Sequence, residues 1–283
     1  MLELILTTAK NDERIRTVIG SRGNPNAPKD PFQDFDILYL ITDMALFIHN
    51  LEWIERFGEL TMLQMPETMQ DPPPENDGHF GYLMLFEDGN RIDLTLYPLE
   101  EFNPDNLDSL SVLLLDKDNR FEPFLPSSDS DYLPTPPTEK AFADCCNEFW
   151  WVAPGVAKGL WRDEPTYAKY VQEHFVRDHL MKMLGWYVGT KTGFSKSTGK
   201  WGKYLEGVLG LEPELWAMLG ETYSDADEAN SWDALFKMCE LFRVTAREVA
   251  VHFGFEYRQV DDEKVSAYMW RVRVLPRGAK FVN

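Results

Sequence analysis

The chain has 283 residues, which is enough for one large domain or two ordinary ones. Hydrophobic residues make up 44% and aromatic residues 13%, with nine Trp, so the chain can bury a packed core and is neither disordered nor fibrous. Its 28 basic and 47 acidic residues give a net charge of −19, which repels nucleic-acid phosphates and anionic lipids. We therefore expect a globular protein that binds neither nucleic acid nor membranes.

Short apolar stretches separated by Gly, Pro, Asn and Asp characterise the first half, which is typical of strands joined by loops. Asp88 and Gly89 separate two such stretches, so we expect these strands to be antiparallel neighbours joined by a two-residue turn. Apolar residues at helical spacing predict a helix over residues 44–58, which gives a mixed sheet with helices. The predicted strands cover residues 15–19, 35–41, 80–86, 91–97 and 111–116.

Two acidic residues lie at the start of the second predicted strand. Asp34 and Asp36 alternate with apolar residues, so their carboxylates share one face, about 6–7 Å apart. A divalent cation would offset their repulsion, and Mg²⁺ typically takes one or two carboxylates plus substrate phosphates. At the end of the preceding strand, Gly20 would let the backbone approach a phosphate, Ser21 could donate a hydrogen bond, and Arg22 adds positive charge. This arrangement predicts a site for Mg²⁺ and a nucleoside triphosphate.

A third carboxylate completes this prediction. Asp93 lies between Ile92 and Leu94 in a predicted strand, where a buried unpaired carboxylate would be costly, so we expect it to face the same polar edge. It could bind the metal, act as general base for an acceptor hydroxyl, or do both. Asp-X-Asp spacing alone more often marks a solvated strand, and the Gly-Ser pair together with the third Asp favours the functional interpretation.

Pro and Ser become dense over residues 124–138, where no periodicity remains, and we place a domain boundary there. The predicted domains are residues 1–135 and residues 136–283. Thr138 can cap a helix that begins at Glu139, and helical periodicity continues over residues 167–188, 202–219 and 231–253. The sequence therefore predicts an α+β protein, in which a mixed sheet with helices is followed by an α-helical bundle.

A lysine-rich segment follows within the helical half. Residues 182–203 contain five Lys and no Asp or Glu, which indicates either an anion site or a solvated basic face. The segment superficially resembles a P-loop, but five residues rather than four separate Gly193 from Gly199, and Trp201 follows the Lys in place of Ser or Thr. We therefore reject a Walker A motif. The lysines are Lys182, Lys191, Lys196, Lys200 and Lys203.

Charge elsewhere is strongly acidic. Residues 66–135 hold 16 acids and 3 bases, a net −13, which would attract a small polycation.

The three cysteines lack metal-site spacing, and we expect Cys145, Cys146 and Cys239 to be reduced core residues. No apolar run approaches the roughly 20 residues that span a bilayer, so we expect a cytoplasmic protein. We expect five tryptophans of the second half to pack in its core, and one or two of their rings could line a pocket over an adenine or a sugar. They are Trp150, Trp151, Trp161, Trp186 and Trp201.

Several stretches together resemble the aminoglycoside 6-adenylyltransferase family, also called streptomycin adenylyltransferases. They are GSRGNPNAPKDPFQDFDILYLITD, FEDGNRIDLTLYP, VLLLDKD, FADCCNEFWWVAPGVAKGLWRDE and GFSKSTGKWGKY, and the resemblance covers residues 11–245. It implies a polymerase-beta-like nucleotidyltransferase domain followed by a helical domain, with the substrates bound between them. It further implies Mg²⁺-dependent transfer of AMP from ATP to the 6-hydroxyl of streptomycin, which releases pyrophosphate and inactivates the antibiotic.

The resemblance also implies roles for individual residues. Asp34 and Asp36 would hold Mg²⁺, and Asp93 would be the third acid and the general base. Phosphate contacts would come from Gly20, Ser21 and Arg22, and from Lys200 with Lys196 and Lys203 behind it. Two alternatives remain: the same fold could act on another small-molecule or protein hydroxyl, or it could bind ATP without transfer. The sequence leaves the oligomeric state open, with a monomer favoured.

Overall fold

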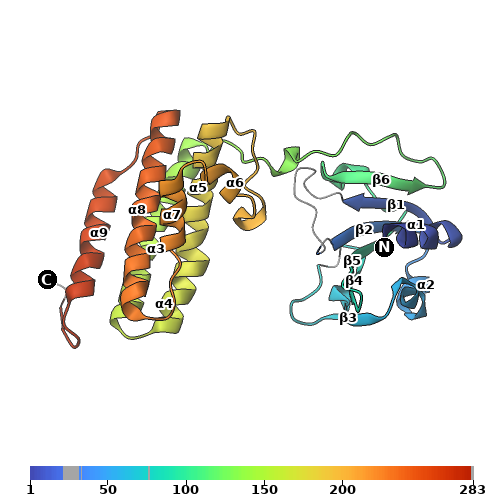
Figure 1. The fold of residues 1–283 in the computed structure, drawn as a ribbon, viewed down its shortest axis with the longest axis horizontal. Helices are drawn as coiled ribbons and strands as arrows, with labels where there is room; N and C mark the ends of the chain where they lie inside the picture. Colours follow the sequence, from blue (N-terminus) through green and yellow to red (C-terminus); the bar gives the residue numbers. More distant parts are fainter. Residues whose placement is uncertain (22–31, 33, 76, 282–283) are drawn as a thin grey trace. The chain divides into compact units, whose positions relative to one another are not determined.

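The structure, a computed structural model, describes residues 1–21, 32, 34–75 and 77–281. The chain divides into two compact units, Met1–Asp131 and Tyr132–Asn283, which we call the first and second units (Figure 1). The first unit is a sheet with helices and the second is helical, as expected for an α+β protein. In these described ranges, no helix is both long and apolar enough to cross a membrane.

The described strands of the first unit form one mixed six-stranded sheet in the order β3-β4-β5-β2-β1-β6. Strands β2 and β5 are parallel, whereas the other neighbours are antiparallel. All five predicted strands are confirmed, and the half-exposed β3 was not predicted. The strands are β1 (Ile15–Ser21), β2 (Asp34–Ile41), β3 (Leu60–Gln64), β4 (Phe80–Phe86), β5 (Arg91–Pro98) and β6 (Ser111–Asp116).

The two faces of the sheet differ in what they bury. Helices α1 (Leu2–Asn11) and α2 (Ala45–Ile48) contribute apolar side chains to one face, where the main cluster of the unit includes Ile37 and Leu94. On the opposite face, Leu40 belongs to a smaller cluster with Ile19 and Leu99. Because side chains alternate along a strand, the acidic residues at the start of β2 share this second face.

The predicted helix over residues 44–58 is wrong in its middle. Helix α2 ends at Ile48, and a separate 3₁₀ turn covers Glu52–Phe57. The carbonyl oxygen of Phe47 accepts hydrogen bonds from Trp53 Nε1 (3.2 Å) and the Tyr82 hydroxyl (3.1 Å). These two side-chain donors take the place of the backbone N–H group that would continue the helix. Local apolar periodicity cannot predict such long-range hydrogen bonds.

The β4–β5 hairpin is antiparallel as predicted, but its two-residue turn is wrong. Leu85 pairs with Arg91, and Phe86 N donates to Asn90 O (3.0 Å), which leaves a three-residue loop over residues 87–89. Gly89 has φ +83°, a left-handed conformation that suits glycine, and Asn90 N donates to Asp88 Oδ1 (2.9 Å). The loop is longer than predicted because Asn90 N bonds to the side chain of Asp88, in place of the backbone carbonyl group that would close a two-residue turn.

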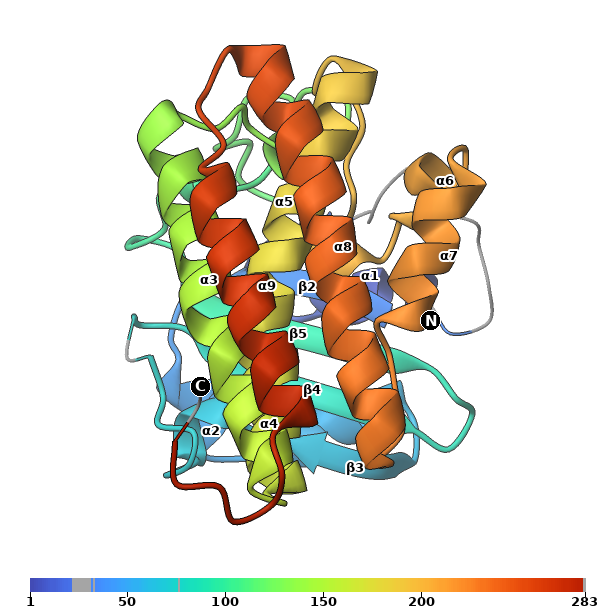
Figure 2. The same cartoon turned by 90° about the vertical axis from the view of Figure 1, so that its left-hand side faces the viewer.

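Several long helices of the second unit lie alongside one another (Figure 2). Their buried apolar side chains form one core. The rings of Phe149 and Phe242 stack with centroids 3.7 Å apart and join α3 to α8. Thr138 caps α3 as predicted, because its hydroxyl accepts a hydrogen bond from Ala141 N (3.1 Å). The helices are α3 (Glu139–Trp161), α4 (Pro165–Val171), α5 (Arg177–Thr192), α6 (Glu206–Leu209), α7 (Pro213–Glu221), α8 (Glu228–Phe253) and α9 (Gln259–Val274).

Some predicted features of this unit need correction. A π-helical turn over Gln172–Val176 separates α4 from α5, and Pro213 begins a new helix after α6. Helix α9 was not predicted, because its buried Asp262 and exposed Val274 blur the apolar stripe.

The buried positions of the cysteines are confirmed, whereas those of the tryptophans are confirmed only in part. All three cysteines are free and buried, and burial raises the pKa of Cys145 and Cys239 to about 12. Trp150 and Trp186 are buried, but Trp151 and Trp201 are 78% and 88% exposed, so core packing is wrong for these two.

Candidate functional site

The predicted carboxylates of the first unit come together where β2 and β5 begin. In the parallel register, Asp36 lies opposite Asp93, and Asp34 lies opposite Arg91. Neighbouring strands are about 4.8 Å apart, so Asp36 and Asp93 are direct cross-strand neighbours on one face. Parallel pairing explains how residues 57 positions apart in the chain meet, because both strands enter the sheet at this edge.

An arginine that the sequence analysis missed occupies this site. Arg91 Nε and Nη2 donate to the two carboxylate oxygens of Asp93 at 2.8 and 2.7 Å, which is a bidentate pair. Arg91 Nη1 also lies 3.7 Å from Asp34 Oδ2. The available signal was the Arg91-Ile92-Asp93 spacing, which places both polar side chains on the same face of a strand.

Electrostatics at the site favour an added positive charge. Partial desolvation, followed by the negative charges of Asp93 and Asp34, raises the pKa of Asp36, while Arg91 opposes the rise. A carboxyl group with a raised pKa is a carboxylate in an unfavourable field. A bound cation would remove that cost in the same way as a proton would.

The end of β1 lies beside this group. Gly20 pairs with Ile37 of β2 and with Val112 of β6, and Ser21 pairs with Ser111. This register places Ser21 at the edge of the sheet where Asp36 lies. A Cβ on Gly20 would lie 2.8 Å from Leu114 Cδ1, the end of a flexible side chain that can move aside, so packing alone does not require a glycine here. The approach of Gly20 to a phosphate stays a prediction. Arg22 lies outside the described residues.

These donors suit a hard divalent cation. Among the residues that the structure describes, no group of three or more His, Cys, Asp or Glu is arranged to hold a metal ion. Asp34 and Asp36 nevertheless offer carboxylate oxygens on one face, the donor type that Mg²⁺ takes together with water and phosphate. Asp93 is bonded through both oxygens to Arg91.

The predicted lysines belong to the second unit, whereas the carboxylates belong to the first. Lys196, Lys200 and Lys203 are exposed. They belong to the connection between α5 and α6, and Figure 1 shows the course of that connection. Within the described part of the chain, none of these three ammonium groups forms an ion pair. Lys191 differs, because its Nζ lies 3.4 Å from Glu248 Oε2.

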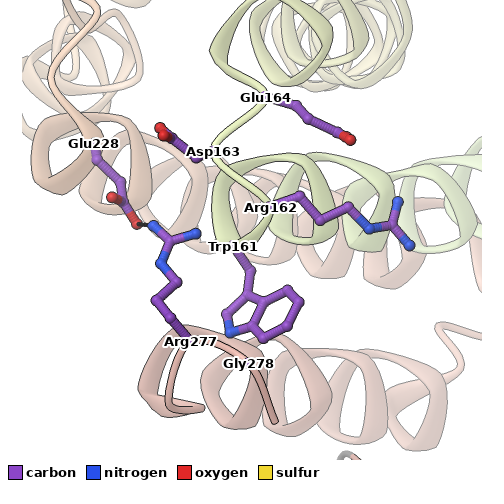
Figure 3. Close-up of a pocket in the computed structure, with 7 residues that line it drawn as sticks. All are labelled: Trp161, Arg162, Asp163, Glu164, Glu228, Arg277 and Gly278. Atoms are coloured by element: carbon purple, nitrogen blue, oxygen red, sulfur yellow. Dashed lines mark hydrogen bonds and ion pairs between the residues drawn. The ribbon is translucent and has the colours of Figure 1, made fainter. Parts of the chain in front are cut away.

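A cavity of about 640 Å³ in the second unit is lined by none of the predicted catalytic, metal-binding or phosphate-binding residues, although Trp161 lines it (Figure 3). It lies where the C-terminal segment is fastened to α3. Trp161 Nε1 donates to Leu275 O (2.9 Å), and Arg277 donates to Leu160 O (3.2 Å) and to Glu228 Oε1 (2.7 Å). These contacts attach this segment to the bundle and account for Arg277 and Glu228 without a ligand.

Comparison with known proteins gives consistent matches. A family model described as streptomycin adenylyltransferase matches residues 1–272. An aminoglycoside 6-adenylyltransferase of Campylobacter jejuni is 42% identical over 273 residues, covering 95% of this chain and 93% of the relative. Another, of Bacillus subtilis (strain 168), is 40% identical over 266 residues, covering 93% of each. A crystal structure of an aminoglycoside 6-adenyltransferase from Bacillus subtilis is 36% identical, covers 97% of each chain and has a TM-score of 0.49.

Proposed function

The chain belongs to the streptomycin adenylyltransferase family, and we propose that it transfers AMP from ATP to the 6-hydroxyl of streptomycin, releasing pyrophosphate. The relatives named aminoglycoside 6-adenylyltransferases support an aminoglycoside nucleotidyltransferase. The observation on this chain that carries the proposal is the Asp36–Asp93 cross-strand pair with Asp34 beside it. Three carboxylates at one sheet edge suit metal-assisted transfer of a phosphoryl group.

In the proposed reaction, the acceptor hydroxyl oxygen forms a bond to the α-phosphorus, and the bond from that phosphorus to the bridging oxygen of pyrophosphate breaks. Asp93 accepts the hydroxyl proton, and Arg91 fixes the orientation of its carboxylate. A carboxylate has about four lone-pair positions, so the bidentate pair leaves room for this proton.

The other residues hold the nucleotide. Asp34 and Asp36 would hold Mg²⁺, which supplies positive charge against the triphosphate when it is bound. Gly20, Ser21 and Arg22 would contact phosphate from the first unit. Lys196, Lys200 and Lys203 would stabilise the negative charge of the phosphates, including that of the leaving pyrophosphate.

The acceptor is a polycation, which matches the acidic surplus. Residues 66–135 carry a net −13, and carboxylates bind guanidinium groups such as those of streptomycin through paired hydrogen bonds. We further propose a polymerase-beta-like nucleotidyltransferase domain over residues 1–135 and a helical domain over residues 136–283. The reaction consumes ATP, which is available in the cytoplasm, where we place the protein.

Adenylyl transfer from labelled ATP to streptomycin, spectinomycin and a kanamycin-type compound tests this proposal. We expect a Mg²⁺-dependent product with streptomycin, and no product with any of the three would contradict the antibiotic function. If none forms, a thermal shift with ATP and Mg²⁺ shows whether the protein binds the nucleotide, as both alternatives require. Stabilisation there would favour another acceptor or a non-catalytic ATP-binding module.

A further inference from the structure

Trp201 has an unusual position in the second unit. Its side chain is 88% exposed, and its backbone has φ +55°, a left-handed conformation that is rare for a bulky residue. Such a conformation is strained for a bulky side chain and persists only where the surrounding structure imposes it. Packing does not repay this cost, because almost all of the indole lies outside the core.

Phe194 provides a direct comparison in the same connection. It also has a positive φ, +59°, but its ring packs closely over Gly189, where an added Cβ would lie only 2.2 Å from it. The ring also lies 6.0 Å from that of Phe253. Phe194 therefore gains packing from its conformation, whereas Trp201 presents its ring to solvent.

The backbone on both sides of Trp201 is closely fixed. Tyr204 N donates to Thr198 O (2.9 Å), and Gly202 N donates to Gly199 O (3.1 Å). The two glycines also have positive φ, and a Cβ on Gly202 would lie 2.6 Å from Met181 Cε. The connection therefore fixes the backbone from which the exposed indole of Trp201 projects.

The charge around the ring indicates which ligand it suits. Lys200 Nζ lies 4.4 Å from the centroid of the indole, and Lys196 and Lys203 belong to the same connection between α5 and α6. A cationic acceptor would be repelled here, whereas ATP combines anionic phosphates with a flat purine. Aromatic rings beside lysines are the usual platform for bases whose phosphates are bound by cations.

We propose that Trp201 is the stacking platform for the adenine of ATP, with the neighbouring lysines on the phosphates. This inference rests on the proposed function, because it assumes that ATP is the nucleotide. It assigns Trp201 to binding of the base rather than to the chemistry of transfer.

Binding to the full-length protein in Mg²⁺ without an acceptor tests the proposal, with ATP and inorganic tripolyphosphate as probes in isothermal titration calorimetry. Trp201→Gly removes the ring and relieves the positive φ, so we expect an unchanged or higher Tm. Its Kd for ATP should rise about 5- to 140-fold, the range that loss of one base–aromatic stack produces. Its Kd for tripolyphosphate should change less than about twofold, because that probe has no base.

Two further variants complete the test. Trp201→Phe should recover most of the ATP affinity. Trp151→Ala, at another exposed indole, on the regular helix α3, should leave both affinities unchanged. Equal ATP affinity in Trp201→Gly and wild type would overturn the inference and leave adenylyl transfer intact. An equal loss for ATP and tripolyphosphate would also overturn it, since the ring would then act only by positioning lysines. Absence of ATP binding by the wild type would instead contradict the proposed function, and this inference with it.

Discussion

Asp36 lies among like charges that a bound cation would neutralise. Its pKa is raised, so the folded state holds this proton more tightly than the unfolded chain does. Stability therefore falls as the pH rises from the usual Asp range through the raised pKa, and the cost persists at neutral pH. Solvent reaches Asp36, and salt will weaken the effect.

Asp36→Asn removes this repulsion and one proposed metal ligand together. We expect adenylyl transfer to be lost and the Tm at pH 7 to rise, with the difference in Tm shrinking as the pH is lowered. Scanning calorimetry across that pH range measures the effect. Asp105→Asn, at an exposed carboxyl in a 3₁₀ turn, is the matched control and should change neither property. A Tm for Asp36→Asn that is lower at neutral pH would show that the carboxylate is stabilising, contrary to this account.

Arg91 tests whether the orientation of Asp93 matters. Arg91→Lys keeps the charge but cannot form the paired hydrogen bonds, so we expect kcat to fall about 10- to 100-fold, as for other groups that orient a reacting ligand. The KM for ATP should change less, since Arg91 is bonded to Asp93 rather than placed to bind the nucleotide. Steady-state kinetics with MgATP separates the two constants. Full activity in Arg91→Lys would remove Arg91 from the mechanism.

Residue spacing predicted the three carboxylates but not their environment. Strand alternation placed Asp34 and Asp36 on one face, and the cost of burying Asp93 indicated a polar edge. Arg91 was missed because its role depends on the hydrogen bonds that it donates to Asp93, and the sequence does not show which partner an arginine binds. The exposure of Trp201 was missed because the backbone that turns the ring outward is fixed by tertiary contacts.

At the scale of elements, helix α9 depends on a buried ion pair. Arg243 donates to both oxygens of Asp262 at 2.6 Å, and Asp262 is 1% exposed. The Tyr257 hydroxyl donates to the same carboxylate at 2.9 Å. Removal of one partner from such a pair leaves the other charge uncompensated, which is far more costly than loss of a surface pair.

Asp262→Ala should therefore lower the free energy of unfolding by about 3 kcal/mol, the lower part of the range for buried pairs because Arg243 is partly solvated. Urea denaturation measures this change. The adjacent Asp261 forms only a more exposed pair with Arg258, at 3.2 Å, so Asp261→Ala should cost about 1 kcal/mol or less. Equal losses in the two variants would show that the buried pair does not anchor α9.

Elements with strong local signals were predicted well, and those decided by distant contacts were not. Thr138 and the periodicity after it correctly located the start of α3, and alternation correctly located β2 and β5. The break after α2 arises from Trp53 and Tyr82 bonding to one carbonyl group, which no local pattern contains. Helix α9 was missed because an ion pair, rather than an apolar stripe alone, holds it in place.

Over the whole molecule, charge is distributed unevenly between regions of sequence. Two stretches would attract different ligands: cations at the acidic residues 66–135, and anions at the lysine-rich residues 182–203. Cationic streptomycin should therefore bind more weakly as salt increases. We expect the KM for streptomycin to rise severalfold between low salt and about 0.3 M NaCl, since screening shortens the Debye length below about 10 Å. A KM that is independent of salt would show that the acidic surplus does not attract the acceptor.

The direct test of the central claim is to identify the product formed from streptomycin, ATP and Mg²⁺. We predict a single adenylylated streptomycin, with NMR locating AMP on the 6-hydroxyl, one pyrophosphate released per product, and no product with Asp36→Asn. Failure to form any adenylylated streptomycin with the folded wild-type protein, or undiminished product with Asp36→Asn, would contradict the account.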